Sequence, residues 1–219
     1  HIYYTQETVV KQLYEYIQNN YSQNEPILVS ELECAGYTKN NIRQQIMLLA
    51  NFGKLCRYDT GVYYIPGKSI FKSGTSLNQN QVIEKKYFYE TNERCGYYSG
   101  LTFANKIGLT TQVPNTYEVT TNKATKDYRV TNIASSKIVI RRPRVLISND
   151  NYKVLQFLDL LKDVELYSEL DIDEAGKIIM NYAEKSKITF SQMADFLQYY
   201  PDSIYKNMYK VGILNGISS

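Results

Sequence analysis

Between Thr38 and Pro66 the spacing of apolar residues switches from that of a helix to that of a β-strand, and the switch occurs at Gly53. No other feature of the sequence constrains the possible folds as strongly. The first part of this stretch, TKNNIRQQIMLLAN, repeats apolar residues at the spacing of one helix face and begins at a capping Thr38. After Gly53 the residues alternate as in a hairpin, with a turn at Asp59–Gly61. The pattern predicts a helix followed by a two-stranded antiparallel ribbon.

Elements upstream of this stretch complete a recognisable order. TQETVVKQLYEYIQNN has helical spacing, Pro26–Leu28 can form a short strand, and Ser30 can cap a short helix over Ser30–Glu33. Helix, strand, helix, helix and hairpin is the element order of a winged helix-turn-helix, a DNA-binding motif. We therefore predict such a domain over residues 1–68.

The outer face predicted for the second long helix carries side chains that can read base edges in the major groove. Arg, Asn and Gln do so through paired hydrogen bonds, while Lys39 and Arg57 would contact phosphates. Gln45 is predicted on the same face. The candidate DNA-binding residues are Thr38, Lys39, Asn40, Asn41, Arg43, Gln44, Arg57, Tyr58 and Tyr63. A solvated face or a protein-interaction module has the same pattern, and residues 1–70 carry six basic and six acidic residues, a neutral balance for a DNA binder.

Charge is uneven along the rest of the chain. Residues 71–150 carry 12 Lys and Arg against 6 Asp and Glu, whereas residues 151–219 carry 7 against 10. The strongest cluster is Arg141, Arg142 and Arg144 in KIVIRRPRVL. These arginines can hold nucleic-acid phosphates, pair with the acidic tail or an acidic partner, or protect an edge strand against aggregation.

A polar linker rich in Gly, Ser and Asn is predicted over residues 69–81, followed by a second domain over 82–219. NQVIEKKYFYE is helical in spacing, and Ser99 can cap a helix that ends at Gly108. Thr110–Thr121 favours an extended segment broken by Pro114, and DYRVTNI and SKIVIRRPRVLIS favour further strands. The second domain is therefore predicted to be mixed α+β.

The segment from Lys153 onward is helical in spacing, and a last helix is predicted from Asp202. Its tyrosines, which can form a partner-binding face or part of the core, are Tyr199, Tyr200, Tyr205 and Tyr209. The predicted fold class is α+β, with an N-terminal winged helix-turn-helix followed by a mixed α+β domain that has a helical C-terminal part.

Composition removes several kinds of chemistry. The only histidine is His1, which excludes Ser-His-Asp triads and histidine-based acid–base catalysis. The separated Cys34, Cys56 and Cys95 indicate reduced thiols in the cytosol rather than disulfides or a zinc site. No signal peptide and no apolar run of about 20 residues is visible, so we expect a soluble cytoplasmic protein. The chain starts at His1 rather than Met, so its natural N-terminus can lie upstream.

Two features that could be catalytic have simpler explanations. Ser99 lies in GYYSG, which does not match the G-x-S-x-G nucleophile elbow, and a helix cap explains it. Asp171, Asp173 and Glu174 could bind a metal ion, but acidic residues also favour the first turn of a helix. We predict no enzymatic activity, no cofactor and no metal, with a metal nuclease as the least favoured alternative.

The segment GYYSGLTFANKIGLTTQVPNTYEVTTN, preceded by GKLCRYDTGVYYIP, resembles AbiEi-type antitoxins of bacterial type IV toxin–antitoxin (abortive infection) systems and the related AbiEi-like transcriptional regulators. The match is sharpest from Ser99-Gly100 through Gly108-Leu109-Thr110 to Gln112–Asn115. FLQYYPDSIYKNMYKVGILNG is a looser match, and the resemblance covers most of the chain.

This resemblance implies a winged helix that represses its own operon and a C-terminal part that neutralises a nucleotidyltransferase-type toxin. The implied partners are operator DNA with inverted repeats and such a toxin, antagonised with or without stable direct binding. A stand-alone regulator without a toxin and a winged-helix module that binds proteins instead of DNA are the alternatives.

Overall fold

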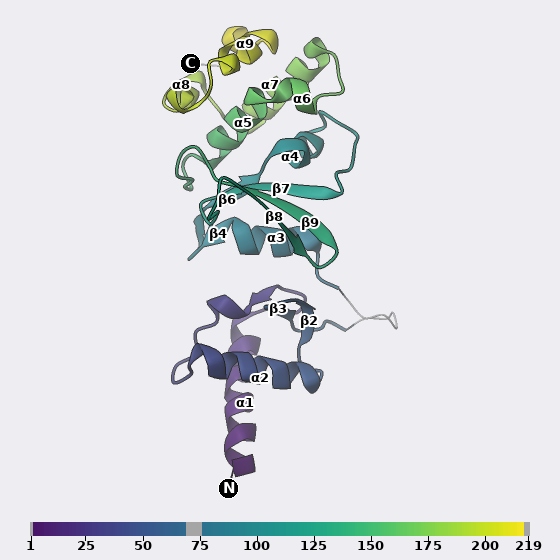
Figure 1. Cartoon of the computed structure of the whole chain (residues 1–219), viewed down its shortest axis with the longest axis vertical. Coiled ribbons are helices and arrows are strands. Elements are labelled where there is room, and N and C mark those ends of the chain that lie inside the picture. Colours follow the sequence, from purple (N-terminus) through teal and green to yellow (C-terminus); the bar gives the residue numbers. More distant parts are fainter. Residues whose placement is uncertain (1, 69–75, 217–219) are drawn as a thin grey trace. The chain divides into compact units, whose positions relative to one another are not determined.

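The computed structural model describes residues 2–68 and 76–216 and has an α+β fold (Figure 1). The chain divides into two compact units, His1–Lys86 and Tyr87–Ser219. Of the predicted linker over 69–81, residues 69–75 lie outside the described residues, and Gln79 already begins a helix. The boundary between the units therefore lies at the end of this helix, between Lys86 and Tyr87, instead of preceding it.

The first unit contains two long helices and a small sheet. Its elements are α1 (Ile2–Asn20), β1 (Ile27–Leu28), the 3₁₀ turn η1 (Val29–Glu31), α2 (Lys39–Asn51), β2 (Cys56–Asp59), β3 (Val62–Tyr64) and most of α3 (Gln79–Tyr87). The described strands form an antiparallel sheet in the order β1-β3-β2, with Tyr63 opposite both Ile27 and Arg57. The predicted short strand, capped helix and hairpin are confirmed, whereas the helix predicted over Ser30–Glu33 is the shorter turn η1.

The hydrophobic core of this unit determines which face of each long helix points inward. Leu13 and Ile17 of α1 are fully buried, and so are the apolar positions of α2, which are Ile42, Ile46 and Leu49. Burial of one such side chain contributes about 1.5–3 kcal/mol. At the start of α2, Thr38 Oγ1 accepts the Asn41 N–H at 3.2 Å, which confirms the predicted cap.

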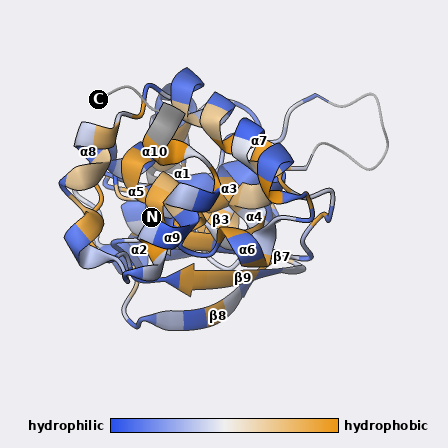
Figure 2. Ribbon diagram, turned by 90° about the horizontal axis from the view of Figure 1, so that it is seen from above, coloured by the Kyte–Doolittle hydropathy of each residue, from blue (hydrophilic) through white to orange (hydrophobic). Residues whose placement is uncertain are grey.

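The second unit is built on a four-stranded sheet. Its first elements are β4 (Tyr89–Glu90), β5 (Glu93–Arg94), β6 (Gly96–Tyr98), α4 (Gly100–Ile107), β7 (Thr116–Thr121), β8 (Tyr128–Ile133) and β9 (Ser136–Arg141). Among the described strands, β4 and β5 form a separate hairpin and the larger sheet has the order β6-β7-β9-β8, with β7 and β9 parallel. Figure 2 shows that β9 is apolar along most of its length and that its neighbour β8 is more polar, as suits an edge strand.

Helices cover one face of this sheet (Figure 1). They are α4, α5 (Tyr152–Lys162), α6 (Val164–Tyr167), α7 (Ile172–Lys185), α8 (Phe190–Ala194), the turn η2 (Leu197–Tyr199), α9 (Ser203–Lys210) and α10 (Ile213–Gly216). The buried side chain of Asn207 in α9 donates to the carbonyls of Leu161 and Lys162, both at 2.9 Å. These carbonyls belong to the last turn of α5, so Asn207 ties α9 to the end of α5.

Two predicted strands are shorter than expected. β7 forms only from Thr116, because Asn105 Nδ2 donates to the carbonyls of Thr110 and Gln112 and holds the preceding segment out of the sheet. β9 ends at Arg141, before Pro143, which lacks the N–H that a strand ladder needs.

The predicted tyrosine face is divided between core and surface. Tyr199, Tyr205 and Tyr209 are exposed, whereas Tyr200 is buried. No helix in the described part of the chain is both long enough and apolar enough to cross a lipid bilayer.

Candidate functional site

A polar surface on α2 is the first candidate site. Asn40, Asn41, Arg43 and Gln44 are all exposed, and we name these four residues the α2 polar surface. Positions three and four apart adjoin on a helix, so these side chains form one continuous patch. Ile42, Ile46 and Leu49 on the opposite side of α2 pack in the core, so the α2 polar surface faces solvent.

Gln45 does not belong to this patch. Its residue is only 7% exposed, and its Oε1 has no hydrogen-bond partner among the described residues. The prediction that placed it on the polar face is therefore wrong, because its position faces Ile42 and Leu49 across one helix turn.

Thr38 and Lys39 have structural partners at the start of α2. Thr38 accepts the capping hydrogen bond, and the Lys39 ammonium donates to the carbonyls of Ser30 at 3.0 Å and Leu32 at 3.2 Å. Lys39 thus ties α2 to the segment after β1, and its charge is already bound where a phosphate contact was predicted.

The hairpin presents only part of the predicted set. Arg57 is exposed and donates from Nη2 to Thr60 Oγ1 at 3.2 Å. Tyr58 is half-buried and its hydroxyl donates to Gln79. Tyr63 is 7% exposed and lies in the core, since β3 is the central strand of its sheet, so the prediction of a surface role for it is wrong.

The arginine cluster lies in the second unit at the end of β9. Arg141 Nε lies 3.5 Å from Glu118 Oε2, and Arg142 Nη1 lies 3.3 Å from Asp127 Oδ1. These carboxylates belong to the middle of the chain. Among the described residues no carboxylate of the acidic tail forms an ion pair with Arg141, Arg142 or Arg144. Arg141 and Arg142 therefore pair within the middle of the chain, whereas the charge of Arg144 favours the ionised form of Asp159, which belongs to the acidic tail.

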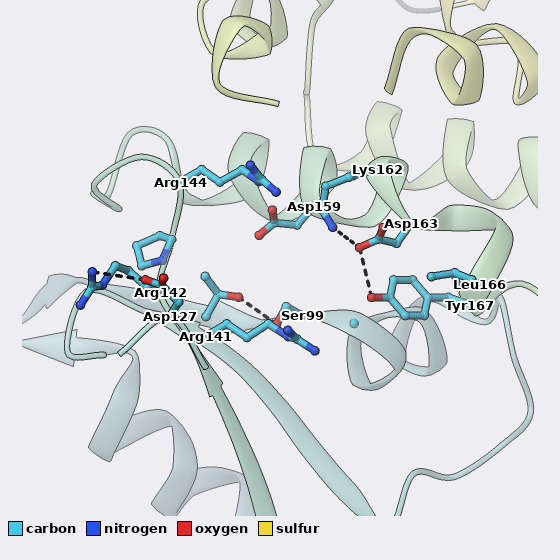
Figure 3. Close-up of a pocket in the computed structure, with 13 residues that line it drawn as sticks. Ser99, Asp127, Arg141, Arg142, Arg144, Asp159, Lys162, Asp163, Leu166 and Tyr167 are labelled. Carbon is cyan, nitrogen blue, oxygen red and sulfur yellow. Dashed lines mark hydrogen bonds and ion pairs between the residues drawn. The ribbon is translucent and has the colours of Figure 1, made fainter. Parts of the chain in front are cut away.

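A cavity of about 580 Å³ adjoins this cluster (Figure 3). Its floor includes Ser99 and Thr120, at the ends of β6 and β7, and its opposite wall comes from α5 and α6. Arg141, Arg142 and Arg144 line it on the side of β9. The arginines stand out in the sequence, but α5 does not, because its approach to them joins distant segments of the chain.

Asp159 of α5 lines this cavity and accepts a hydrogen bond from a buried tyrosine. The Tyr97 hydroxyl donates to Asp159 Oδ2 at 2.7 Å. Burial raises the pKa of Asp159 above its ordinary value, although the Tyr97 hydrogen bond and the charges of Lys162 and Arg144 act in the opposite direction. Burial also raises the pKa of Tyr97 well above its ordinary value, so the phenol remains the donor.

Ser99 occupies the cap position of α4 but does not cap it with its side chain. Its hydroxyl accepts from Thr120 Oγ1 at 2.9 Å inside the cavity. Glu118 Oε1 takes the cap role instead, because it accepts the N–H of Leu101 at 3.3 Å. The predicted position of Ser99 at the start of the helix is confirmed, whereas a capping hydrogen bond from its side chain is not formed. The neighbouring Gly100 shows why Glu118 can approach. A Cβ on Gly100 would lie 2.4 Å from Glu118 Oε2.

The acidic group at the start of α7 has a structural explanation. Asp171 Oδ1 accepts the N–H groups of Asp173 at 3.0 Å and Glu174 at 2.9 Å, as a helix cap does. Across residues 2–68 and 76–216, no three His, Cys, Asp or Glu side chains gather in a way that could hold a metal ion.

Comparisons with known proteins add no family assignment. No protein-family model matches the chain, and no curated protein matches it.

Proposed function

We propose that the first unit is a winged helix-turn-helix and that the protein is a DNA-binding transcriptional regulator. The observation that carries the proposal is the α2 polar surface, which presents Arg, Asn and Gln side chains from the first half of a capped helix. These are the side chains that bind guanine and adenine edges bidentately. The antiparallel hairpin β2–β3 follows α2 as the wing, and the proposal assigns the protein no catalytic activity.

The contacts of the candidate residues divide them into two groups. Arg43 and Gln44 are exposed, and we assign them to base recognition, while the exposed Arg57 of β2 is assigned to a phosphate. Thr38 and Lys39 instead set the position of α2 through their hydrogen bonds. Tyr63 is excluded from the DNA surface by its burial.

Binding of the full-length protein to the DNA upstream of its own gene tests the proposal by fluorescence anisotropy. We expect the double variant Arg43→Ala, Gln44→Ala to lower the affinity for this DNA by about thirtyfold or more, since two bidentate base contacts together contribute about 2–6 kcal/mol. Lys11→Ala, Gln18→Ala removes the same charge from the exposed side of α1 and is the matched control.

Two outcomes would overturn this proposal. An unchanged preference for the upstream DNA over scrambled DNA in the Arg43, Gln44 variant would remove the assignment of base recognition to α2. A complete lack of salt-dependent DNA binding would instead favour the alternative, a winged-helix module that binds proteins, because phosphate contacts release counterions.

We further propose that the protein represses its own operon in the cytoplasm and acts as the antitoxin of a nucleotidyltransferase-type toxin. The resemblance of Ser99–Asn115 to AbiEi-type antitoxins supports this role. Co-expression with the neighbouring gene tests it through rescue of growth. We expect the Arg43→Ala, Gln44→Ala variant to lose repression of the operon but still to rescue growth. If the product of the neighbouring gene is not toxic when it is expressed alone, the protein is a stand-alone regulator and not an antitoxin.

A further inference from the structure

The cavity of the second unit gathers cationic side chains that the proposed DNA contacts do not use. Arg141 reaches it from the end of β9, Arg144 from the following segment and Lys162 from the end of α5 (Figure 3). We propose that this cavity binds a small molecule that carries a phosphate or pyrophosphate group. This inference stands independently of DNA binding by the first unit.

Arg144 is the residue on which the inference depends most. No carboxylate of the described residues lies within ion-pair distance of its guanidinium, which donates from Nη1 to the Tyr199 carbonyl at 3.3 Å and lies over the Tyr200 ring. Figure 3 shows the side chains of Arg144 and Asp159 directed toward one another across the cavity. The remaining N–H groups of this planar fork can bind a phosphate bidentately.

Arg141 adds a second guanidinium from the opposite side. Its Nε lies 3.5 Å from Glu118, and its end extends toward Ser99 in Figure 3. The ion pair with Glu118 orients the fork without using all of its donors, since a guanidinium has five N–H groups. Ser99 accepts from Thr120, so the Ser99 hydroxyl keeps its own proton for a ligand oxygen.

The acidic side chains of the cavity do not block an anion. Asp127 is paired with Arg142 at the rim, and Asp163 is paired with Lys162. Asp159 accepts from Tyr97, and burial raises its pKa, which favours the neutral carboxyl when an anion binds nearby. Neutral Asp159 is a hydrogen-bond donor to a phosphate oxygen.

The shape of the site selects a small molecule over duplex DNA. The volume of about 580 Å³ lies within the range of about 300–1,000 Å³ that is typical of small-molecule pockets. Arg144 and Lys162 point inward from the cavity walls, whereas the phosphates of a duplex contact outward-facing side chains.

Calorimetric titration of the full-length protein with inorganic pyrophosphate at constant ionic strength tests the inference. We expect saturable binding that Arg144→Ala weakens about tenfold or more, as the loss of a charge-assisted bidentate contact predicts. Arg129→Ala removes the same charge from the exposed face of β8, outside the cavity, and should bind like the wild type. Arg144→Lys keeps the charge without the fork and should fall between Arg144→Ala and the wild type.

Competing ligands then identify the source of the phosphate. A nucleoside triphosphate should displace pyrophosphate, and a single-stranded oligonucleotide without a terminal phosphate should not. Equal binding of pyrophosphate by Arg144→Ala and wild type, no binding by wild type, or equal competition by the oligonucleotide would each overturn the inference. The Arg43→Ala, Gln44→Ala variant should bind pyrophosphate normally, which separates this result from the proposed function.

Discussion

At the residue scale, Gly100 explains why a Ser-Gly pair stands at the entrance of α4. Its φ is +56°, a left-handed value, and the Glu118 carboxylate fills the space where a Cβ would lie. This arrangement lets Glu118 bind both the Leu101 N–H and Arg141. One glycine therefore links the helix cap to the arginine side of the cavity.

We predict that Gly100→Ala lowers the free energy of unfolding by about 2–4 kcal/mol, because backbone strain and a steric collision add together. Gly108→Ala is the control, since Gly108 also has a left-handed φ of 87° but has nothing within 4 Å of an added Cβ. It should lower stability by only about 1–2 kcal/mol. Urea denaturation followed by circular dichroism measures both values, and an equal loss in the two variants would refute the collision with Glu118.

Asp159 gives a pH-dependent prediction at the same scale. Burial raises the pKa of Asp159 in the folded state, so its stabilising contribution is complete below the pKa of the unfolded chain, near 3.8, and is lost as the pH rises through the higher folded value. Asp159→Asn should therefore raise the free energy of unfolding at neutral pH by about 1 kcal/mol. Thermal unfolding across pH should show this gain shrink toward acidic pH; a gain independent of pH would contradict the burial argument.

Local sequence patterns predicted the residues whose partners are close in the chain. Thr38 and Asp171 each cap a helix through N–H groups two or three positions ahead. Ser99 has the same local pattern but a different role, because Thr120 and Glu118 approach it from a strand 17 or more positions away. Such long-range partners leave no periodic signal in the sequence.

At the scale of elements, two residues stabilise the start of α2, the capping Thr38 and Lys39. The ammonium binds carbonyls on both sides of Glu31 and so fixes the distance between α2 and the segment after β1. Helical spacing predicted α2, and alternation predicted the β2–β3 hairpin. The central place of β3, which buries Tyr63, requires its pairing with β1 from an earlier part of the chain.

We predict that Lys39→Ala lowers the free energy of unfolding by about 1 kcal/mol, the usual contribution of a hydrogen bond to an exposed group. Its preference for upstream over scrambled DNA should stay close to that of the wild type, because the ammonium is already bound within the protein. Denaturation and anisotropy measure the two quantities. If Lys39→Ala lost its preference for upstream DNA but kept its stability, Lys39 would contact DNA directly.

At the scale of the whole molecule, charge separates the two units. Residues 1–70 are neutral in sum, and the excess of basic residues lies in 71–150, where Arg141 and Arg142 form ion pairs. The proposed DNA surface is therefore expected to select by side-chain hydrogen bonds more than by charge. Composition indicated this imbalance, but only the folded structure shows that the basic side chains surround a cavity.

This balance predicts a shallow dependence of DNA affinity on salt. Arg57→Ala should weaken binding to upstream and scrambled DNA alike and reduce the slope of log K against log salt by about one unit, as expected for one lost phosphate contact. Anisotropy titrations at several salt concentrations measure the slope. A selective loss for the upstream DNA would instead place Arg57 at a base edge.

The hydrogen bonds of Asn207 have a consequence for how substitutions far from the cavity can change it. Its amide holds the last turn of α5 from outside the cavity, next to Lys162, which lines the wall. Substitutions in α9 can thus shift Lys162 by small amounts while every lining residue stays the same. We therefore expect substitutions in α9 to change the proposed binding of a phosphate in the cavity without changing any lining residue.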